Sequence, residues 1–159
     1  MGRIVKIDEL LSIIERERKD RKKIVFTNGC FDILHIGHIS YLKMAKELGD
    51  ILIVGINSDR SVKLLKGNNR PIMNEYERAT IISSLYFVDY VIIFDELRPN
   101  SLIKAIKPDV HVKGGDYKAE SLPEYPIVTS YGGKVVICPY INNRSTSEII
   151  KTIVSRFSR

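Results

Sequence analysis

Two of the three histidines in this chain lie three residues apart in the segment GCFDILHIGH, one on each side of Gly37. His35 comes just before the turn, and His38 falls in the first turn of an expected helix. A glycine between them lets another group approach the backbone, and the start of a helix favours an anion because its N–H groups are free. Imidazoles there can donate to phosphate oxygens as charge shifts during displacement. The spacing therefore predicts a phosphate-binding turn.

Three other interpretations of the histidine pair remain open. Both rings could cap the helix or pack in the core. They could bind a metal with Cys30 or Asp32, although the helical histidine pair of zinc enzymes is spaced i, i+4 and the third histidine lies within an expected strand. Cys30 could be a nucleophile, but no recognisable signature surrounds it. We predict no metal site formed by these side chains.

Continuous apolar runs alternate with helical patterns along the chain. This order predicts a single α/β domain with a doubly wound, Rossmann-like, five-stranded parallel sheet, because strands buried on both faces are apolar throughout. Ligands of such sheets bind beyond the carboxyl ends of the strands. Gly49 is expected to cap the second helix. We expect strands at 23–29, 50–57, 90–94, 109–116 and 132–139, and helices at 8–20, 37–48, 74–87, 99–106 and 145–156. Residues 1–22 are predicted to be an N-terminal helical extension of a main domain at 23–159.

The charge of the chain favours an acidic partner. The formal net charge is +6, with basic runs at 16–23 and 60–70. The first run is typical of a solvated helix end, and the second, which contains Gly67 and two asparagines, is interpreted as a loop suited to phosphate. The longest apolar runs are too short to span a bilayer, and Cys30 and Cys138 do not form a disulfide framework. We therefore expect a cytoplasmic protein without a membrane partner.

The segment TNGCFDILHIGHISYLKMAKELGD resembles the signature of the nucleotidyltransferase superfamily that carries the His-x-Gly-His motif. The segments NSDRSVKLLKG, RPI, VKGGDY and STSEII are most similar to the heptose 1-phosphate adenylyltransferase domain of bifunctional ADP-heptose synthase. The resemblance covers roughly residues 24–154 and makes 23–159 a nucleotidyltransferase domain. It implies that ATP, accompanied by Mg²⁺, and D-glycero-β-D-manno-heptose 1-phosphate give ADP-heptose and pyrophosphate.

The resemblance also implies roles for particular residues. His35, His38 and Lys66 would be catalytic, and Asp32, Lys63 and Arg78 would bind the sugar substrate. Simpler interpretations stay open for some of them: the two lysines could be solvated, Arg78 could pair with an acid, and Ser145 with Glu148 could form a capping box. Arg144 could supply an arginine that the cytidylyltransferases have further upstream. The nucleotide-binding residues would be Thr27, Asn28, Gly29, Phe31, Gly37, Gly114, Gly115, Asp116, Ser145, Thr146 and Ser147.

The same resemblance sets expectations about partners and alternatives. A separate sugar kinase would supply the sugar 1-phosphate, the chain would form a homodimer, and nucleic acid is not expected as a partner. Other reactions remain possible: a cytidylyltransferase acting on glycerol 3-phosphate or another small phosphorylated alcohol, or a heptose-phosphate guanylyltransferase that uses GTP. A protein that binds nucleotide without turnover is the least favoured alternative.

Overall fold

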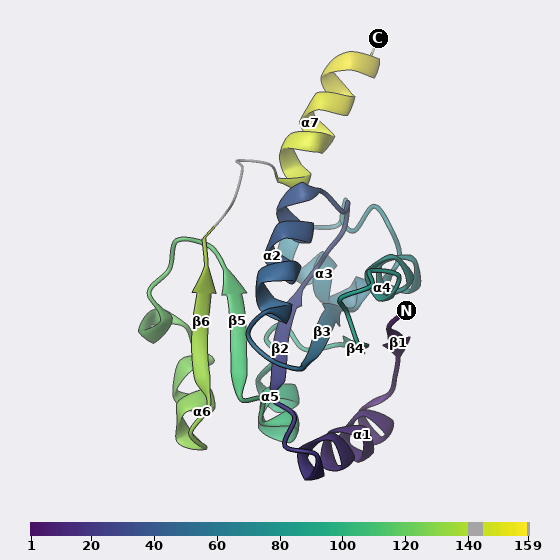
Figure 1. Ribbon diagram of the computed structural model, residues 1–159. Helices are drawn as coiled ribbons and strands as arrows, with labels where there is room; N and C mark the ends of the chain where they lie inside the picture. Colours follow the sequence, from purple (N-terminus) through teal and green to yellow (C-terminus); the bar gives the residue numbers. More distant parts are fainter. Residues whose placement is uncertain (140–144, 159) are drawn as a thin grey trace.

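One six-stranded parallel sheet runs through the molecule, in the order β1-β4-β3-β2-β5-β6 (Figure 1). The computed structural model describes residues 1–139 and 145–158. The sequence predicts a parallel sheet, as observed, but the predicted number of five strands was wrong. The sixth strand, β1 at the edge of the sheet, has two residues and is too short to show a sequence pattern. The strands are β1 (Arg3–Ile4), β2 (Ile24–Gly29), β3 (Ile51–Asn57), β4 (Tyr90–Phe94), β5 (Val110–Gly114) and β6 (Lys134–Cys138).

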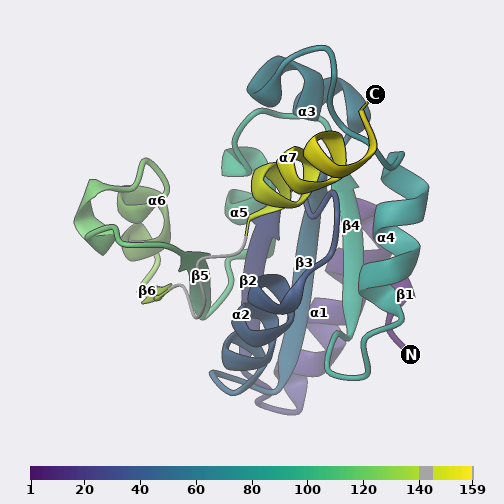
Figure 2. The same cartoon turned by 90° about the horizontal axis from the view of Figure 1, so that it is seen from above.

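Helices cover both faces of the sheet (Figures 1 and 2). The apolar side chains of α2 and α4 pack on one face, and those of α1, α5 and α6 pack on the other. We call these the α2 face and the α5 face. The helices are α1 (Ile7–Lys19), α2 (Ile36–Lys46), α3 (Asp59–Lys66), α4 (Glu75–Ser83), α5 (Asn100–Ile106), α6 (Tyr125–Ser130) and α7 (Thr146–Phe157), with a 3-10 turn η1 (Ala119–Ser121).

The order of the strands places a switch point between β2 and β5. The chain passes from β2 to β3 and β4 on one side, and the later strands β5 and β6 lie on the other side of β2. At such a point the connections on either side lead to opposite faces of the sheet, which opens a crevice at the carboxyl ends of the strands. The segment with the two histidines directly follows β2, so it lies at this crevice.

Two local predictions were wrong. The basic segment 60–70 was interpreted as a loop, but its first part is helix α3, which the Ser58 hydroxyl caps by accepting from the N–H of Ser61 at 3.1 Å. Gly49 does not cap α2, which ends with Glu47 in right-handed backbone. A Cβ on Gly49 would lie 2.6 Å from Cγ2 of Val25, so this glycine allows the turn before β3 to pack against β2.

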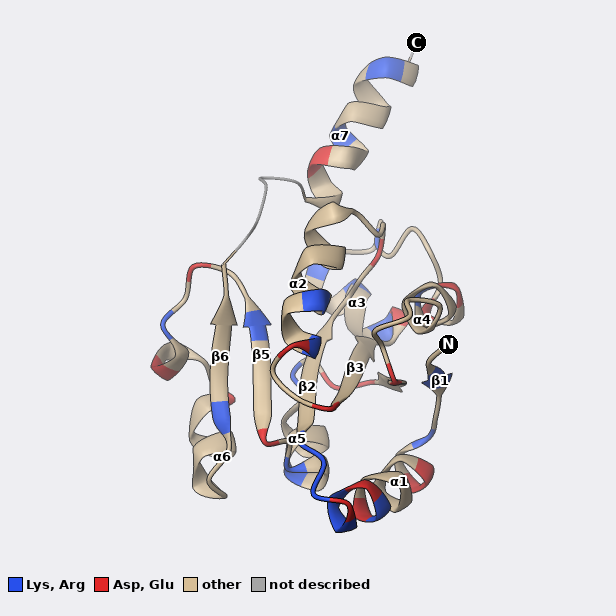
Figure 3. Ribbon diagram, viewed as in Figure 1, with Lys and Arg blue, Asp and Glu red and all other residues tan. Residues whose placement is uncertain are grey.

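The N-terminal segment packs on the sheet. β1 pairs with β4, and α1 buries Leu10, Ile13 and Ile14 against the α5 face. Figure 3 shows acidic and basic residues mixed along α1, so the basic run at 16–23 forms the solvated end of this helix. The boundary at residue 22 stays a prediction. None of the helices in the described residues is long and apolar enough to cross a membrane.

His111 should make the protein sensitive to acid. Its ring is fully buried on β5 and stacks on Phe26 with centroids 5.6 Å apart. Burial, with the nearby charge of Lys113, lowers its pKa to about 3. Because the unfolded ring takes up a proton near its usual pKa of about 6.5, the stability that the neutral ring contributes is complete above that pH and is lost towards pH 3.

The size of this effect can be measured in one variant. We expect His111 to account for a loss of about 2 kcal/mol of unfolding free energy between pH 7 and pH 5. His111→Leu, which is similar in size and does not titrate, should lose correspondingly less over the same range. Urea unfolding of both proteins at the two pH values checks this, and an equal loss in both would contradict it.

Candidate functional site at the carboxyl edge of the sheet

The turn between β2 and α2 brings the two histidines together. Their rings stack with centroids 3.8 Å apart and planes 30° apart. Phe31, in left-handed backbone with φ of 48°, packs its ring 5.3 Å from that of His38. A Cβ on Gly29 would lie 3.1 Å from the Phe31 ring, so the small residue at the end of β2 leaves room for this packing. The structure therefore gathers four of the predicted site residues at the start of α2.

The histidine pair is suited to an anionic ligand. Burial, reinforced by the neighbouring His35, lowers the pKa of His38 to about 4, so the ring is neutral at pH 7 in the free protein. Nδ1 of His38 is buried and has no hydrogen-bond partner in the described part of the chain. Within the described residues, the side chain of His35, the N-cap residue of α2, makes no capping hydrogen bond. An arriving phosphate would satisfy such donors and would raise the pKa of His38.

A second helix N-terminus meets the same turn. The Thr146 hydroxyl at the start of α7 donates to the carbonyl of Ile33 at 3.4 Å, and Figures 1 and 2 show this end of α7 beside the start of α2. Ser145 forms the predicted capping box with Glu148, and Ser147 is exposed in the first helical turn. Two helix N-termini thus supply partial positive charge at one place. Arg144 lies outside the described residues.

Thr27 and Tyr41 fix the position of α2. The Thr27 hydroxyl is fully buried and lies in hydrogen-bond contact with the Tyr41 hydroxyl of α2. Both hydroxyls lie 2.9 Å from the carbonyl oxygen of Val112 on β5. This contact joins the helix that carries the histidines to the two strands at the switch point.

Asp32 and Arg78 are engaged with protein groups. The Asp32 carboxylate is 2% exposed and accepts from Arg70 at 2.6 Å and from the N–H groups of Ile72 and Met73, both at 3.0 Å. Burial alone would raise the pKa of Asp32, but these backbone and arginine donors outweigh it and lower the pKa. Substrate binding by Asp32 and Arg78 stays a prediction, and the hydrogen bonds of Asp32 also position the segment before α4.

Arg78 is fully buried and connects three segments of the chain by hydrogen bonds. Its guanidinium donates to the carbonyl of Cys30 at 2.6 Å, to the carbonyl of Met73 at 3.0 Å and to the carboxylate of Asp59 at 2.8 Å. The predicted pairing with an acid is present, with Asp59 of α3 as the partner.

The two candidate lysines lie near the end of α3. Lys63 and Lys66 are both exposed. Burial raises the pKa of the Cys30 thiol, and the charge of Lys66 opposes this rise. Lys66 therefore lies close enough to the turn after β2 for its charge to act on Cys30.

Gly114, Gly115 and Asp116 lie at the end of β5 and just beyond it. Gly115 has φ of 140°, and a Cβ there would lie 2.4 Å from the ring of Tyr117. Its N–H donates to the carbonyl of Cys138 at the end of β6, at 3.0 Å. Asp116 is exposed. The glycine therefore allows the chain to turn tightly at the crevice.

Sequence reasoning missed three residues of this site. Tyr41, Arg70 and Lys113 all lie in segments that carry the resemblance, but the resemblance implied no role for them, and their hydrogen-bond partners lie far away in the chain. The alternation of side chains along β5 could have indicated that Lys113 faces the crevice.

In the described residues, no three His, Cys, Asp or Glu side chains gather as a metal site.

A family model described as cytidylyltransferase-like matches residues 26–154, which contain both histidines, the β5 glycines and α7 up to Val154. The chain belongs to the cytidylyltransferase-like family. Two curated members of similar sequence are both named bifunctional protein HldE. The one from Geobacter metallireducens is 50% identical over 98% of this chain, and the one from Koribacter versatilis is 50% identical over 94%. The chain spans 32% and 31% of these two proteins, respectively.

Solved structures show the same fold. A lipopolysaccharide core biosynthesis protein from Thermoplasma volcanium superimposes with a TM-score of 0.60 at 32% identity, over 77% of this chain and 99% of that one. Pantoate-beta-alanine ligase from Francisella tularensis gives 0.59 at 20% identity, over 92% of this chain and 69% of that one. The second likeness concerns the fold alone.

Proposed function

We propose that this chain transfers the adenylyl group of ATP to D-glycero-β-D-manno-heptose 1-phosphate, giving ADP-heptose and pyrophosphate. The observation that carries the proposal is the stacked histidine pair at the start of α2, beside the N-terminus of α7 and at the switch point of the sheet. The similarity to HldE proteins and to the heptose-phosphate adenylyltransferase motifs supports this choice of substrates.

The reaction is an in-line displacement at the α-phosphorus of ATP. An oxygen of the sugar phosphate attacks the phosphorus, and the bond to the pyrophosphate oxygen breaks. The attacking group is already anionic at pH 7 because the second pKa of a phosphate monoester is about 6, so no general base is required. The protein contributes positioning and charge neutralisation. His35 and His38 would donate to the phosphate oxygens whose negative charge grows.

The other site residues fall into groups by their position. From the α3 side, Lys66 would neutralise phosphate charge during the reaction, and Lys63 would bind the sugar phosphate. The segments Gly114–Asp116 and Ser145–Ser147 would border the nucleotide at the ends of β5 and α7. Thr27, Asp32 and Arg78 would hold α2 and the turn in place.

Mg²⁺ fits this site as a companion of the nucleotide. The groups at the start of α2 are imidazoles and N–H donors, which suit phosphate oxygens, and the Asp32 carboxylate is already engaged by Arg70. Mg²⁺ is commonly bound by substrate phosphates and water with few protein ligands, and it would neutralise charge on the departing pyrophosphate.

The proposal also implies partners. A sugar kinase acting earlier in the pathway would supply the sugar 1-phosphate. We further propose that the chain acts as a homodimer in the cytoplasm.

A substrate panel tests the function. We expect pyrophosphate release to be fastest with ATP and the heptose 1-phosphate, and at least tenfold slower when CTP or GTP replaces ATP or glycerol 3-phosphate replaces the sugar, because unpaired polar groups in the site penalise the wrong partner. Faster turnover with CTP and glycerol 3-phosphate, or with GTP and the heptose phosphate, would contradict the proposal. Nucleotide binding without pyrophosphate release from any pair would favour a non-catalytic protein.

A further inference from the structure

The end of β2 separates two sets of polar side chains. Thr27 points to the α2 face, where it contacts Tyr41. Asn28 is the next residue, so its side chain points to the α5 face. On β5, Val110 and Val112 pack on the α2 face, which places His111 and Lys113 on the α5 face as well. The switch point therefore has the histidine site on one side and a second polar set on the other.

Lys113 is the centre of this second set. Its ammonium donates to Oδ1 of Asn28 at 3.3 Å, which is its only hydrogen bond within the described residues. Burial lowers the pKa of Lys113, and the negative charge of Glu124, 4% exposed at the start of α6, opposes this effect. A partly buried ammonium with three donors and one neutral acceptor has unused capacity for an anion.

Glu124, whose charge acts on Lys113, has an unused hydrogen-bond acceptor. Oε2 of Glu124 is buried and has no hydrogen-bond partner in residues 1–139 and 145–158. A buried polar atom without a partner is unfavourable, and such atoms gather at sites that a ligand completes. Lys113 and Glu124 thus bring a positive and a negative charge to one side of the crevice. The ammonium suits a phosphate, and the carboxylate suits a neighbouring hydroxyl group of the same ligand.

In-line geometry indicates which phosphate belongs here. The attacking and leaving oxygens lie on opposite sides of the phosphorus. In the proposed function, the start of α2 holds the phosphates of ATP on the α2 face. The acceptor must then approach from the other side, across the end of β2, where Asn28 and Lys113 lie.

We propose that Asn28 and Lys113 form the binding site for the phosphate of the acceptor, so that the two substrates occupy opposite faces of the switch point. This assignment rests on the proposed function and gives a role to Lys113, for which the resemblance implied none. Lys113 binds the acceptor phosphate and thereby sets its approach to the α-phosphorus.

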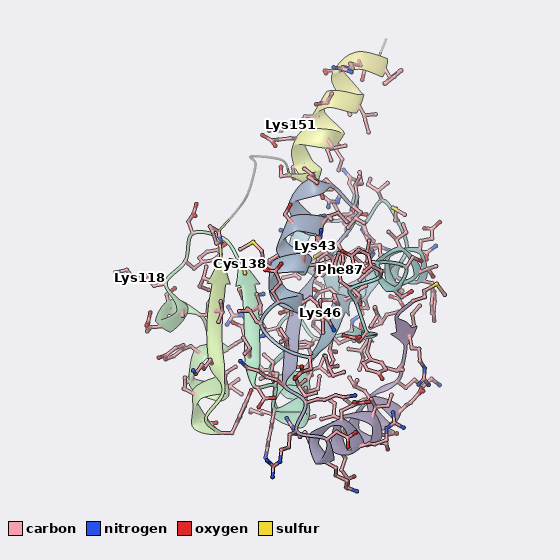
Figure 4. The ribbon with its side chains drawn as sticks, in the orientation of Figure 1. Lys43, Lys46, Phe87, Lys118, Cys138 and Lys151 are labelled. Carbon is pink, nitrogen blue, oxygen red and sulfur yellow. The ribbon has the colours of Figure 1, made fainter. Side chains whose placement is uncertain are left out.

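Kinetic constants of a Lys113→Met variant test this site. Loss of a charged hydrogen bond should raise KM for the sugar phosphate about 10- to 100-fold and leave KM for ATP within about twofold. Lys113→Arg should restore part of the affinity because it keeps the charge. The matched control is Lys118→Met, since Lys118 lies on the outer loop beyond β5 (Figure 4). A raised KM for ATP, or an unchanged KM for the acceptor, would overturn the assignment.

A binding experiment separates this site from the reaction itself. Inorganic phosphate is titrated calorimetrically into enzyme saturated with a non-hydrolysable ATP analogue. Wild type and Lys118→Met should bind phosphate, and Lys113→Met should bind it at least tenfold more weakly while binding the analogue normally. If no sugar phosphate in the panel is turned over, the proposed function is wrong, but this titration still shows whether Lys113 binds a phosphate. Equal phosphate binding by wild type and Lys113→Met would overturn it.

Discussion

His38→Ala should lose about 100- to 1000-fold in the rate of pyrophosphate release, the usual effect of removing one donor to a developing oxyanion. The ring lies within the histidine stack at the start of α2, and its buried Nδ1 has no hydrogen-bond partner in the described residues. Because this donor acts mainly in the transition state, kcat and kcat/KM should fall together while KM for ATP changes little.

Two further variants make the His38 result specific. His38→Gln keeps an N–H donor of similar reach, so it should retain more activity than His38→Ala. Lys43→Ala removes a side chain from the exposed side of the same helix (Figure 4) and should keep the wild-type rate. Near-normal turnover by a folded His38→Ala variant would show that the histidine pair is not the catalytic group.

The central elements of the fold could be predicted because their patterns are long and locally determined. β3 is buried at every residue, so its apolar run could only be a strand of a sheet covered on both faces. The capping boxes of α4 and α7 start at Asn74 and Ser145 as the sequence indicates. The sequence predicts that this helix ends at Phe87, but α4 ends at Ser83. The residues that follow form a turn before β4, and their apolar side chains pack into the core.

The parts that could not be predicted depend on partners distant in the chain. β1 is a strand only because β4 accepts it at the edge of the sheet. α3 was missed because its apolar residues do not mark its buried face: Leu64 and Leu65 are exposed, whereas Ser61 is buried beside Val62. The roles of Asp32 and Arg70 follow from a contact across 38 residues. A motif can identify such residues as important, but only the fold shows whether each faces the ligand or supports the turn.

Arg78→Ala should lower the free energy of unfolding by about 2–5 kcal/mol, the usual cost of truncating a large, fully buried side chain, to which the loss of its hydrogen bonds contributes. Its guanidinium is 0% exposed and connects the turn after β2, the segment before α4, and Asp59 of α3. Truncation leaves the carbonyl groups of Cys30 and Met73 without these donors and opens a cavity where the side chain lay.

Urea unfolding distinguishes this supporting role from a contact with substrate. Arg78→Lys keeps the charge but cannot reach all three partners, because an ammonium lacks the planar fork of a guanidinium, so its stability should lie between those of the wild type and Arg78→Ala. Arg98→Ala, at an exposed arginine, should unfold like the wild type. If Arg78→Ala were as stable as the wild type but had a raised KM for the sugar phosphate, Arg78 would bind substrate directly. A loss of stability in the free protein instead means that the residue holds the turn in which the two histidines meet.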